Sequence, residues 1–146
     1  MKTRLLACIV AAAACVTAVS CSDNEPIKRP VQFDLPAGLT PDIARNEVVV
    51  FHTQPELDAA FGSEAAKLPK VDFKNASLAM ATGLSDYGII SLDHSMTADG
   101  EGGYVLDVTV TENFATVVLP WTIAYIMPKG VSEGDISLHV THKSGS

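Results

Sequence analysis

Cysteine is nearly absent from this sequence, and its three cysteines, Cys8, Cys15 and Cys21, all lie within the first 21 of 146 residues. If Cys21 is acylated, as argued below, the mature chain has neither a free thiol nor a disulfide. A disulfide framework of the kind that stabilises many small exported domains is then excluded. Thiol-based catalysis is excluded for the same reason.

Basic residues are also few. Removing residues 1–20 takes away Lys2 and Arg4 but no acidic residue, which leaves 8 basic against 17 acidic residues and a net charge of −9. Nucleic-acid binding needs clustered Lys and Arg to neutralise phosphates, so nucleic acid is excluded as a partner. The same deficit argues against a polybasic contact with anionic lipid. The 126 residues that remain suit one domain.

The N-terminus has the pattern of an export signal. Lys2 and Arg4 precede an apolar, alanine-rich run from Leu5 to Val19. This order is typical of a secretory signal peptide. The run is short for a transmembrane helix, which needs about 20 apolar residues. We therefore predict that residues 1–20 are a signal peptide.

The run ends in Ala18-Val19-Ser20-Cys21, which resembles a lipobox, where the cysteine is acylated and the chain is cleaved before it. Cys8 lies inside the apolar core, and cleavage at Cys15 would leave a hydrophobic start to the mature chain. We predict that lipid on Cys21 anchors the protein in a membrane, since each buried CH₂ contributes about 0.8 kcal/mol. The alternative is an ordinary secretory signal with Cys21 unmodified.

The predicted location is the cell envelope, with the protein lipid-anchored in the outer membrane. An acidic tract, Ser22 to Glu25, directly follows the predicted anchor. In some Gram-negative bacteria such tracts resemble a signal for display on the outer surface. The alternative is that the tract is a solvated tether that carries no localisation signal. The sequence therefore predicts neither the periplasmic face nor the cell surface in preference to the other.

We divide the mature chain into a lipidated tether with an irregular lead-in, residues 21–46, and one globular β-rich domain, residues 47–146. The lead-in contains four prolines, which disfavour a regular ladder, although Val31 to Leu35 alternates and could form an edge strand. Val48 to Phe51 is a β-branched run typical of a buried strand.

A capped helix is predicted next. Thr53 is the N-cap, Pro55 lies in the first turn, and Glu56 stands three residues after the cap, which together indicate a capping box. Leu57 and Phe61 lie four residues apart and so share one apolar face.

From Lys70 onward the chain is predicted to form strands joined by turns. Residues 104–111 and 136–140 alternate between apolar and polar residues, whereas 115–127 is a long apolar stretch. The expected strands cover residues 77–82, 87–93, 104–111, 115–127 and 136–140. Pro120 interrupts the fourth of these and predicts an edge, a bulge or a bend. The connections are short, which favours antiparallel meanders. The predicted class is α+β, mainly β: an antiparallel meander sheet or sandwich with one N-terminal helix packed on it.

Periodicity also predicts the core. Tyr104, Leu106, Val108 and Val110 share one face of their strand, and we expect them to point inward together with Trp121 and Ile123. The same argument places Leu57 and Phe61 of the helix over this face of the sheet.

No pattern in the sequence predicts a catalytic site, a bound cofactor or a metal site, so the protein is not expected to be an enzyme. Of the four histidines, His52, His94, His139 and His142, the last two are three residues apart on a strand and should point to opposite faces. The loop from Asp99 to Gly103 has too few carboxylates for a calcium site. Gly83-Leu84-Ser85 lacks the second glycine of a nucleophile elbow.

Aromatic residues are the remaining candidates for a binding site. Trp121 and Tyr125 share a strand face and could form a recognition pair, extended by Tyr87 and Tyr104. We favour a core position for Trp121, because it lies in the longest apolar run of the mature chain and large aromatic residues mostly bury their area.

From Glu47 onward, the order of motifs resembles the C-terminal domain of the B-type protease-complex subunit and related small bacterial envelope lipoproteins. The strand and capped helix are followed by Val71-Asp72-Phe73, by Tyr87-Gly88, by Pro120-Trp121 and by Met127-Pro128-Lys129. The resemblance implies a non-catalytic domain that binds or stabilises other cell-envelope proteins.

A second resemblance is to chagasin-type inhibitors of cysteine proteases, which present a Gly-x-Gly-Gly loop and an Arg-Pro-Trp loop. Gly100 to Gly103 matches the first, and Pro120-Trp121 matches part of the second. It implies protease inhibition as the alternative function. The candidate binding surface from the two resemblances is Tyr87, Gly102, Gly103 and Trp121. Inhibition requires Trp121 exposed at a loop tip beside Gly102; a buried Trp121 supports a structural role.

Overall fold

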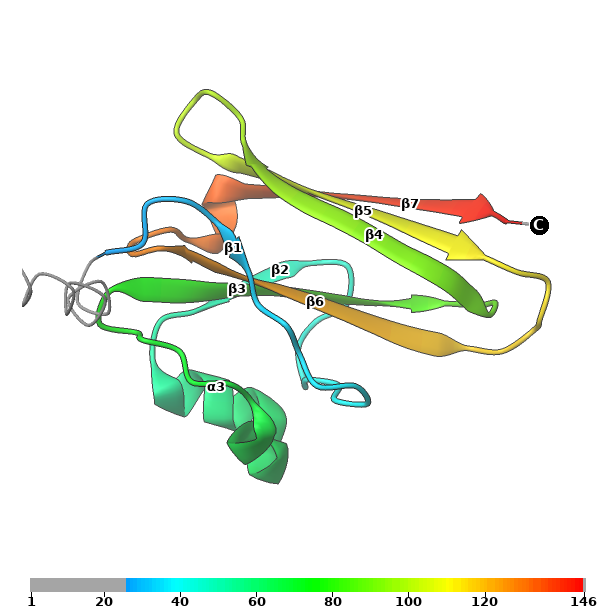
Figure 1. Cartoon of the computed structure of the whole chain (residues 1–146), viewed down its shortest axis with the longest axis horizontal. Helices are drawn as coiled ribbons and strands as arrows, with labels where there is room; N and C mark the ends of the chain where they lie inside the picture. Colours follow the sequence, from blue (N-terminus) through cyan, green and yellow to red (C-terminus); the bar gives the residue numbers. More distant parts are fainter. Residues whose placement is uncertain (1–25, 146) are drawn as a thin grey trace, which may run out of the picture.

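The structure is a computed structural model, and it describes residues 26–145, so the predicted signal peptide and Cys21 lie outside the described residues. Seven strands form two facing sheets, and the α-helix of this region covers the outer side of one of them (Figure 1). The predicted class, α+β and mainly β, is confirmed.

The two sheets contain four and three strands. In the four-stranded sheet the order is β1 (Val31–Gln32), β6 (Leu119–Pro128), β3 (Ala76–Ser85) and β2 (Val48–Phe51). In the three-stranded sheet the order is β4 (Ile89–Ala98), β5 (Tyr104–Glu112) and β7 (Ile136–Ser144). The helix is α3 (Gln54–Phe61), and short 3-10 segments follow it at Gly62–Lys67 and precede β7 at Glu133–Asp135.

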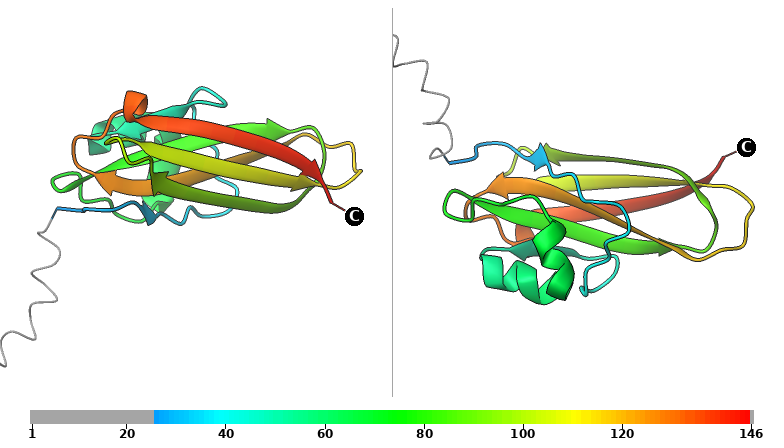
Figure 2. Two further views of the ribbon diagram at one scale, coloured as in Figure 1. Left: turned by 90° about the horizontal axis from the view of Figure 1, so that it is seen from above. Right: turned by 60° about the horizontal axis from the view of Figure 1, so that its bottom comes forward.

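One strand pair departs from the predicted antiparallel meander. β5 and β7 are parallel, with Tyr104 beside Ile136 and Glu112 beside Ser144. The chain leaves β5 for β6 in the other sheet and then returns to β7 (Figure 2). Because β6 runs back along the sandwich, β7 has the same direction as β5. The meander prediction was therefore wrong for β7.

The predicted inward row of β5 is confirmed. Leu106, Val108 and Val110 are each 1% exposed or less, and they pack with Trp121 and Ile123 between the two sheets. Tyr104, at the start of the row, is partly buried against the same cluster.

The predicted position of the helix was wrong. Leu57 and Phe61 are buried, but they pack against Leu78 and Met80 on the outer side of the four-stranded sheet, in a second core. The physical reason is that β3 is buried on both faces: its small residues Ala79 and Ala81 belong to the core between the sheets, and its larger residues Leu78 and Met80 to the core under α3. Figure 2 shows the helix on the outer side of this sheet. A strand covered on both sides carries apolar residues at every position, so its alternation cannot show which face a helix covers.

The N-terminal cap of α3 is confirmed. Thr53 Oγ1 accepts a hydrogen bond from Glu56 N at 3.4 Å, and Glu56 Oε1 accepts from Thr53 N at 3.1 Å. The same carboxylate oxygen accepts from His52 N at 2.6 Å. This last contact is the largest cause of the lowered pKa of Glu56.

The lead-in belongs partly to the packed structure. Val31 and Gln32 pair with β6 as an edge strand, shorter than the predicted Val31–Leu35. Phe33 is buried in the second core, and its N–H bonds to the carbonyl oxygen of Ala124 at 3.0 Å. Packing therefore begins upstream of Glu47, the predicted start of the domain. Pro120 lies where β6 has β3 on one side and no partner opposite, so the predicted edge position is confirmed.

Candidate binding surface at the loop end of the sandwich

Two connections and the C-terminus meet at one end of the sandwich, which we call the loop end (residues 84–90, 112–118 and 142–145). Asn113 N bonds to the carbonyl oxygen of Gly88 at 2.9 Å, and Gly88 N bonds to that of Ala115 at 3.0 Å. Gly145 N bonds to the carbonyl oxygen of Glu112 at 2.8 Å. Backbone hydrogen bonds thus hold the three segments together.

The first described residues lie at the opposite end (Figure 1). Ile27 N bonds to the carbonyl oxygen of Asn75, directly before β3, whereas Tyr87 follows the end of β3. A ten-residue strand is about 33 Å long at 3.3 Å per residue. The length of the sandwich therefore separates the loop end from the N-terminal attachment.

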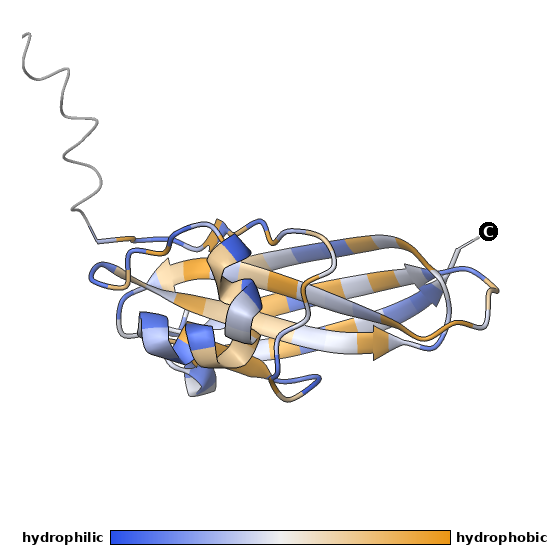
Figure 3. Ribbon diagram, turned by 90° about the horizontal axis from the view of Figure 1, so that it is seen from below, coloured by the Kyte–Doolittle hydropathy of each residue, from blue (hydrophilic) through white to orange (hydrophobic). Residues whose placement is uncertain are grey.

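Exposed apolar side chains gather at the loop end. Among the described residues, six large hydrophobic residues are exposed, and five of them lie here: Tyr87, Ile90, Phe114, Val117 and Val118. Phe114 is 81% exposed and Val118 is 60% exposed, while the sixth residue, Val31, is on β1. Figure 3 shows apolar residues on the β5–β6 connection at the same end as the C-terminus. Clustered exposed apolar surface is typical of an interaction site, whereas scattered single residues are not.

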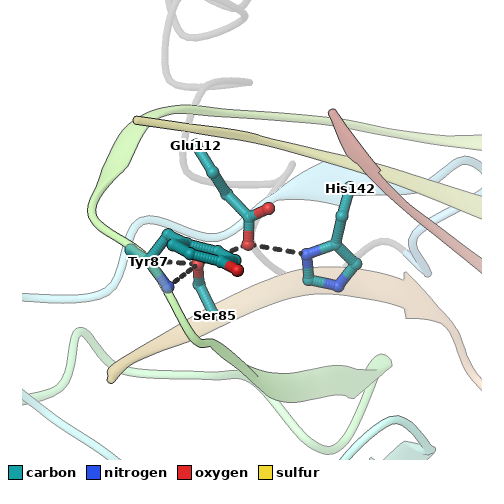
Figure 4. A network of polar contacts seen from close by, with 4 residues as sticks. All are labelled: Ser85, Tyr87, Glu112 and His142. Atoms are coloured by element: carbon teal, nitrogen blue, oxygen red, sulfur yellow. Dashed lines mark hydrogen bonds and ion pairs between the residues drawn. The ribbon is translucent and has the colours of Figure 1, made fainter. Parts of the chain in front are cut away.

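Beneath these residues, a polar network joins the two sheets (Figure 4). The Ser85 hydroxyl lies 2.5 Å from Glu112 Oε2, and His142 Nδ1 lies 3.0 Å from the same oxygen. The hydroxyl also lies 2.7 Å from the carbonyl oxygen of Tyr87 and accepts a hydrogen bond from Tyr87 N at 3.1 Å. Its single proton is best directed to the carboxylate, because charge-assisted hydrogen bonds are the stronger ones.

The three side chains of this network each follow the buried part of an inward-facing row. Glu112 is two residues beyond the buried Val110 on β5, and Ser85 is two residues beyond Gly83 on β3. His142 is two residues beyond the half-buried Val140 on β7. Because strand residues alternate between faces, these polar groups close the core between the sheets where it meets solvent.

The geometry of the network is that of structural hydrogen bonds between the two sheets, and it lacks the serine–histidine contact of a catalytic relay. A serine hydrolase needs the serine hydroxyl within reach of a histidine nitrogen. Here Ser85 is fully buried, and Ser85 and His142 contact one carboxylate oxygen rather than each other. The hydrogen bond from Ser85, and next the one from His142, lowers the pKa of Glu112.

This lowered pKa predicts an acid-sensitive contribution to stability. The Glu112 carboxylate binds a proton more readily in the unfolded chain, where its pKa has the ordinary value of 4.5. Its contribution is therefore present above that value and is lost as the pH falls through the lower folded-state pKa. We expect Glu112→Gln to unfold at lower urea concentration at neutral pH and to lose less stability than the wild type on acidification. A variant that matches the wild-type acid profile would contradict this, and Glu101→Gln at the other end is the charge-matched control.

The sequence-predicted surface residues do not form one surface. Tyr87 lies at the loop end and is 44% exposed. Gly102 and Gly103 lie in the β4–β5 hairpin at the opposite end, where Asp99 Oδ1 accepts from Gly103 N at 3.0 Å. Trp121 is 3% exposed between the sheets, so its recognition role was wrong and the favoured core position is confirmed.

The other aromatic residues proposed to extend the recognition pair are also largely internal. Tyr125 is 6% exposed, and its hydroxyl lies 2.6 Å from His94 Nδ1. Tyr104 is partly buried at the end of β5 that lies away from Tyr87. Of the four candidate aromatic residues, only Tyr87 is exposed.

Sequence reasoning missed the most exposed members of the patch. Residues 115–127 were predicted as one strand-like stretch, but β6 begins at Leu119, so Val117 and Val118 lie on the connection. Phe114 is a single aromatic residue in a short polar segment, Asn113-Phe114-Ala115-Thr116. An aromatic residue with no periodic apolar neighbours was the one signal that could have indicated it.

The histidine prediction is confirmed. His139 faces outward, 3.5 Å from Asp107, whereas His142 faces Glu112. Within residues 26–145, no three histidine, cysteine or acidic side chains are grouped in a way that could hold a metal ion. No helix in this region has the length and apolar character needed to cross a membrane.

Comparison with protein-family models, with curated proteins and with solved structures gives no match for this chain. The two resemblances noted in the sequence therefore stay predictions.

Proposed function

We propose that this protein is a non-catalytic, lipid-anchored protein of the cell envelope that binds or stabilises another envelope protein through its loop end. The observation that carries the proposal is the gathering of five exposed apolar side chains at one end of the sandwich. The predicted anchor, Cys21, precedes Ile27 by six residues, and Ile27 is attached at the other end. The patch is therefore directed away from the attachment.

The exposed aromatic and aliphatic side chains of the patch suit a protein contact. A buried aromatic side chain contributes about 150–250 Å² of area, and a typical interface covers about 800 Å² on each partner. Phe114 is the most exposed member and is carried on a connection that is hydrogen-bonded to its neighbour. An aromatic side chain has only two side-chain torsions to fix and so loses little conformational entropy on binding, which makes Phe114 the expected centre of the contact.

The position of Trp121 gives the protease-inhibitor alternative no support. That function required an exposed Trp121 beside Gly102. The indole is buried between the sheets, and Gly102 belongs to the hairpin at the opposite end.

The anchoring part of the proposal predicts the behaviour of Cys21→Ala. Without a thiol to acylate, the exported chain should move from the membrane fraction to the soluble fraction, and fractionation followed by immunoblotting measures this. A variant that stays with the membrane after signal cleavage would show that Cys21 is not the anchor. The proposed outer-membrane location is checked by density separation, and protease treatment of intact cells distinguishes the cell surface from the periplasmic face.

The binding part is tested by isolating the full-length protein from gently solubilised membranes and identifying what accompanies it. Phe114→Ser should lose the partner, because it removes the most exposed apolar side chain of the patch. Val31→Ser is the matched control, since it removes an apolar side chain of 52% exposure outside the loop end. Equal loss or equal retention of the partner by the two variants would contradict the assignment.

A further inference from the structure

Two hollows at the loop end adjoin at Tyr87 and Glu112. One has a volume of about 280 Å³ and is also lined by Asp86 and His142. The other has a volume of about 180 Å³ and is also lined by Phe114. Tyr87 and Glu112 thus line both hollows, while Asp86 lines only the first and Phe114 only the second. We call this pair of neighbouring hollows the loop-end recess.

The chemistry of the loop-end recess favours a cation. Tyr87 and Phe114 expose aromatic rings, whose faces attract positive charge. Glu112 uses Oε2 for its contacts with Ser85 and His142, and Oε1 accepts no hydrogen bond within residues 26–145. In Figure 4 the Tyr87 ring lies beside this carboxylate. A positive group placed against the ring would therefore lie near the negative charge of this carboxylate.

The basic residues near the recess, Lys143 and His142, do not supply a cation to it. Lys143 belongs to the outward row of β7, since it alternates with His142 and pairs with Thr111. His142 faces Glu112 through Nδ1 and bonds to the oxygen that Ser85 also contacts. The mature chain carries a net charge of −9, which adds a long-range preference for a basic partner.

We propose that the loop-end recess receives an arginine side chain of the partner protein, flanked there by apolar residues. Arginine fits better than lysine, because a flat guanidinium stacks on an aromatic ring while its forked N–H groups donate to carboxylates. Val117 and Val118, exposed on the neighbouring connection, would cover the flanking apolar residues. This inference rests on the proposed function, because it assumes that the patch binds a protein.

The test uses the full-length protein in detergent micelles with its three tyrosines replaced by 3-fluorotyrosine and followed by ¹⁹F NMR. The probe is acetyl-Leu-Arg-Leu-amide, and the control peptide has neutral citrulline in place of arginine.

The arginine peptide should shift the Tyr87 resonance saturably and leave those of Tyr104 and Tyr125 unchanged. Citrulline should weaken binding at least tenfold. Asp86→Asn should weaken the arginine peptide several-fold, whereas Glu101→Gln, with the same charge change in the opposite hairpin, should not.

Equal binding of the two peptides would overturn the proposal, because it would show apolar contact without recognition of the guanidinium. An unchanged Tyr87 resonance would overturn it as well. Either result is separable from failure of the proposed function: if Phe114→Ser still loses its partner in membranes, the loop end binds a protein by other contacts. If the Phe114→Ser and Val31→Ser variants also behave alike, both proposals fail.

Discussion

Leu106→Ala is expected to lower the free energy of unfolding by about 2–5 kcal/mol, whereas Val105→Ala should cost clearly less. Leu106 is 1% exposed between the sheets. Truncating it removes apolar contacts and leaves a cavity that a close-packed core fills only in part. Val105 is on the solvent side of the same strand and is only partly buried, so its truncation leaves no enclosed cavity. Urea denaturation of the two full-length variants measures the difference.

Comparing the stability losses of Leu106→Ala and Val105→Ala also tests which face of β5 is buried. Equal losses would mean that the three-stranded sheet is covered on both faces, as the four-stranded sheet is. A larger loss for Val105 would mean that the strand faces the opposite way, and the inward row that ends at Glu112 would be wrong with it.

Gly83→Ala is the second substitution with a large expected effect. A Cβ atom at Gly83 would lie 2.4 Å from Cζ2 and 2.6 Å from Cε2 of Trp121, closer than real Cβ contacts. The indole is 3% exposed and is enclosed between the sheets, so it has little room to move. We expect a loss of about 1–3 kcal/mol from overpacking, visible as a lower urea midpoint.

Two comparisons test this explanation for Gly83. Gly134→Ala should be close to neutral, because no heavy atom lies within 4 Å of a Cβ placed there. In a double-mutant cycle, Trp121→Leu should reduce the cost of Gly83→Ala, since the smaller side chain removes the clash. Additive costs would show that the effect of Gly83→Ala does not come from Trp121.

Local sequence patterns predicted local structure well. The capping box from Thr53 to Glu56, the inward row of β5 and the opposite faces of His139 and His142 all follow from spacing alone. Each of these features depends on helix or strand geometry over a few residues, and that geometry is nearly constant.

Features that depend on distant parts of the chain were not predicted. Periodicity shows which residues of β7 point inward, but not that β5 is its parallel neighbour. It also could not place α3, because Leu78 and Met80 on one face of β3 and Ala79 and Ala81 on the other are all buried. The small residues of β3 face the second sheet and the larger ones face the helix. This difference becomes evident only once the layers are assembled.

The candidate site was predicted only at Tyr87. Trp121 was a candidate because of its residue type, but its burial depends on Gly83 opposite it in β3, which leaves space for the indole. Phe114 was passed over because its neighbours have no periodicity. Its exposure follows from its place on a connection between sheets, which only the topology reveals.

The most direct test of the proposed binding role is site-specific photo-crosslinking in living cells. A photoreactive amino acid at position 114 or 118 should give one discrete adduct containing the same partner protein, because both positions are exposed at the loop end. The same amino acid at position 31 should not give that adduct. Finding it at position 31 with equal yield, or at neither 114 nor 118, would contradict the proposal that the loop end binds an envelope protein.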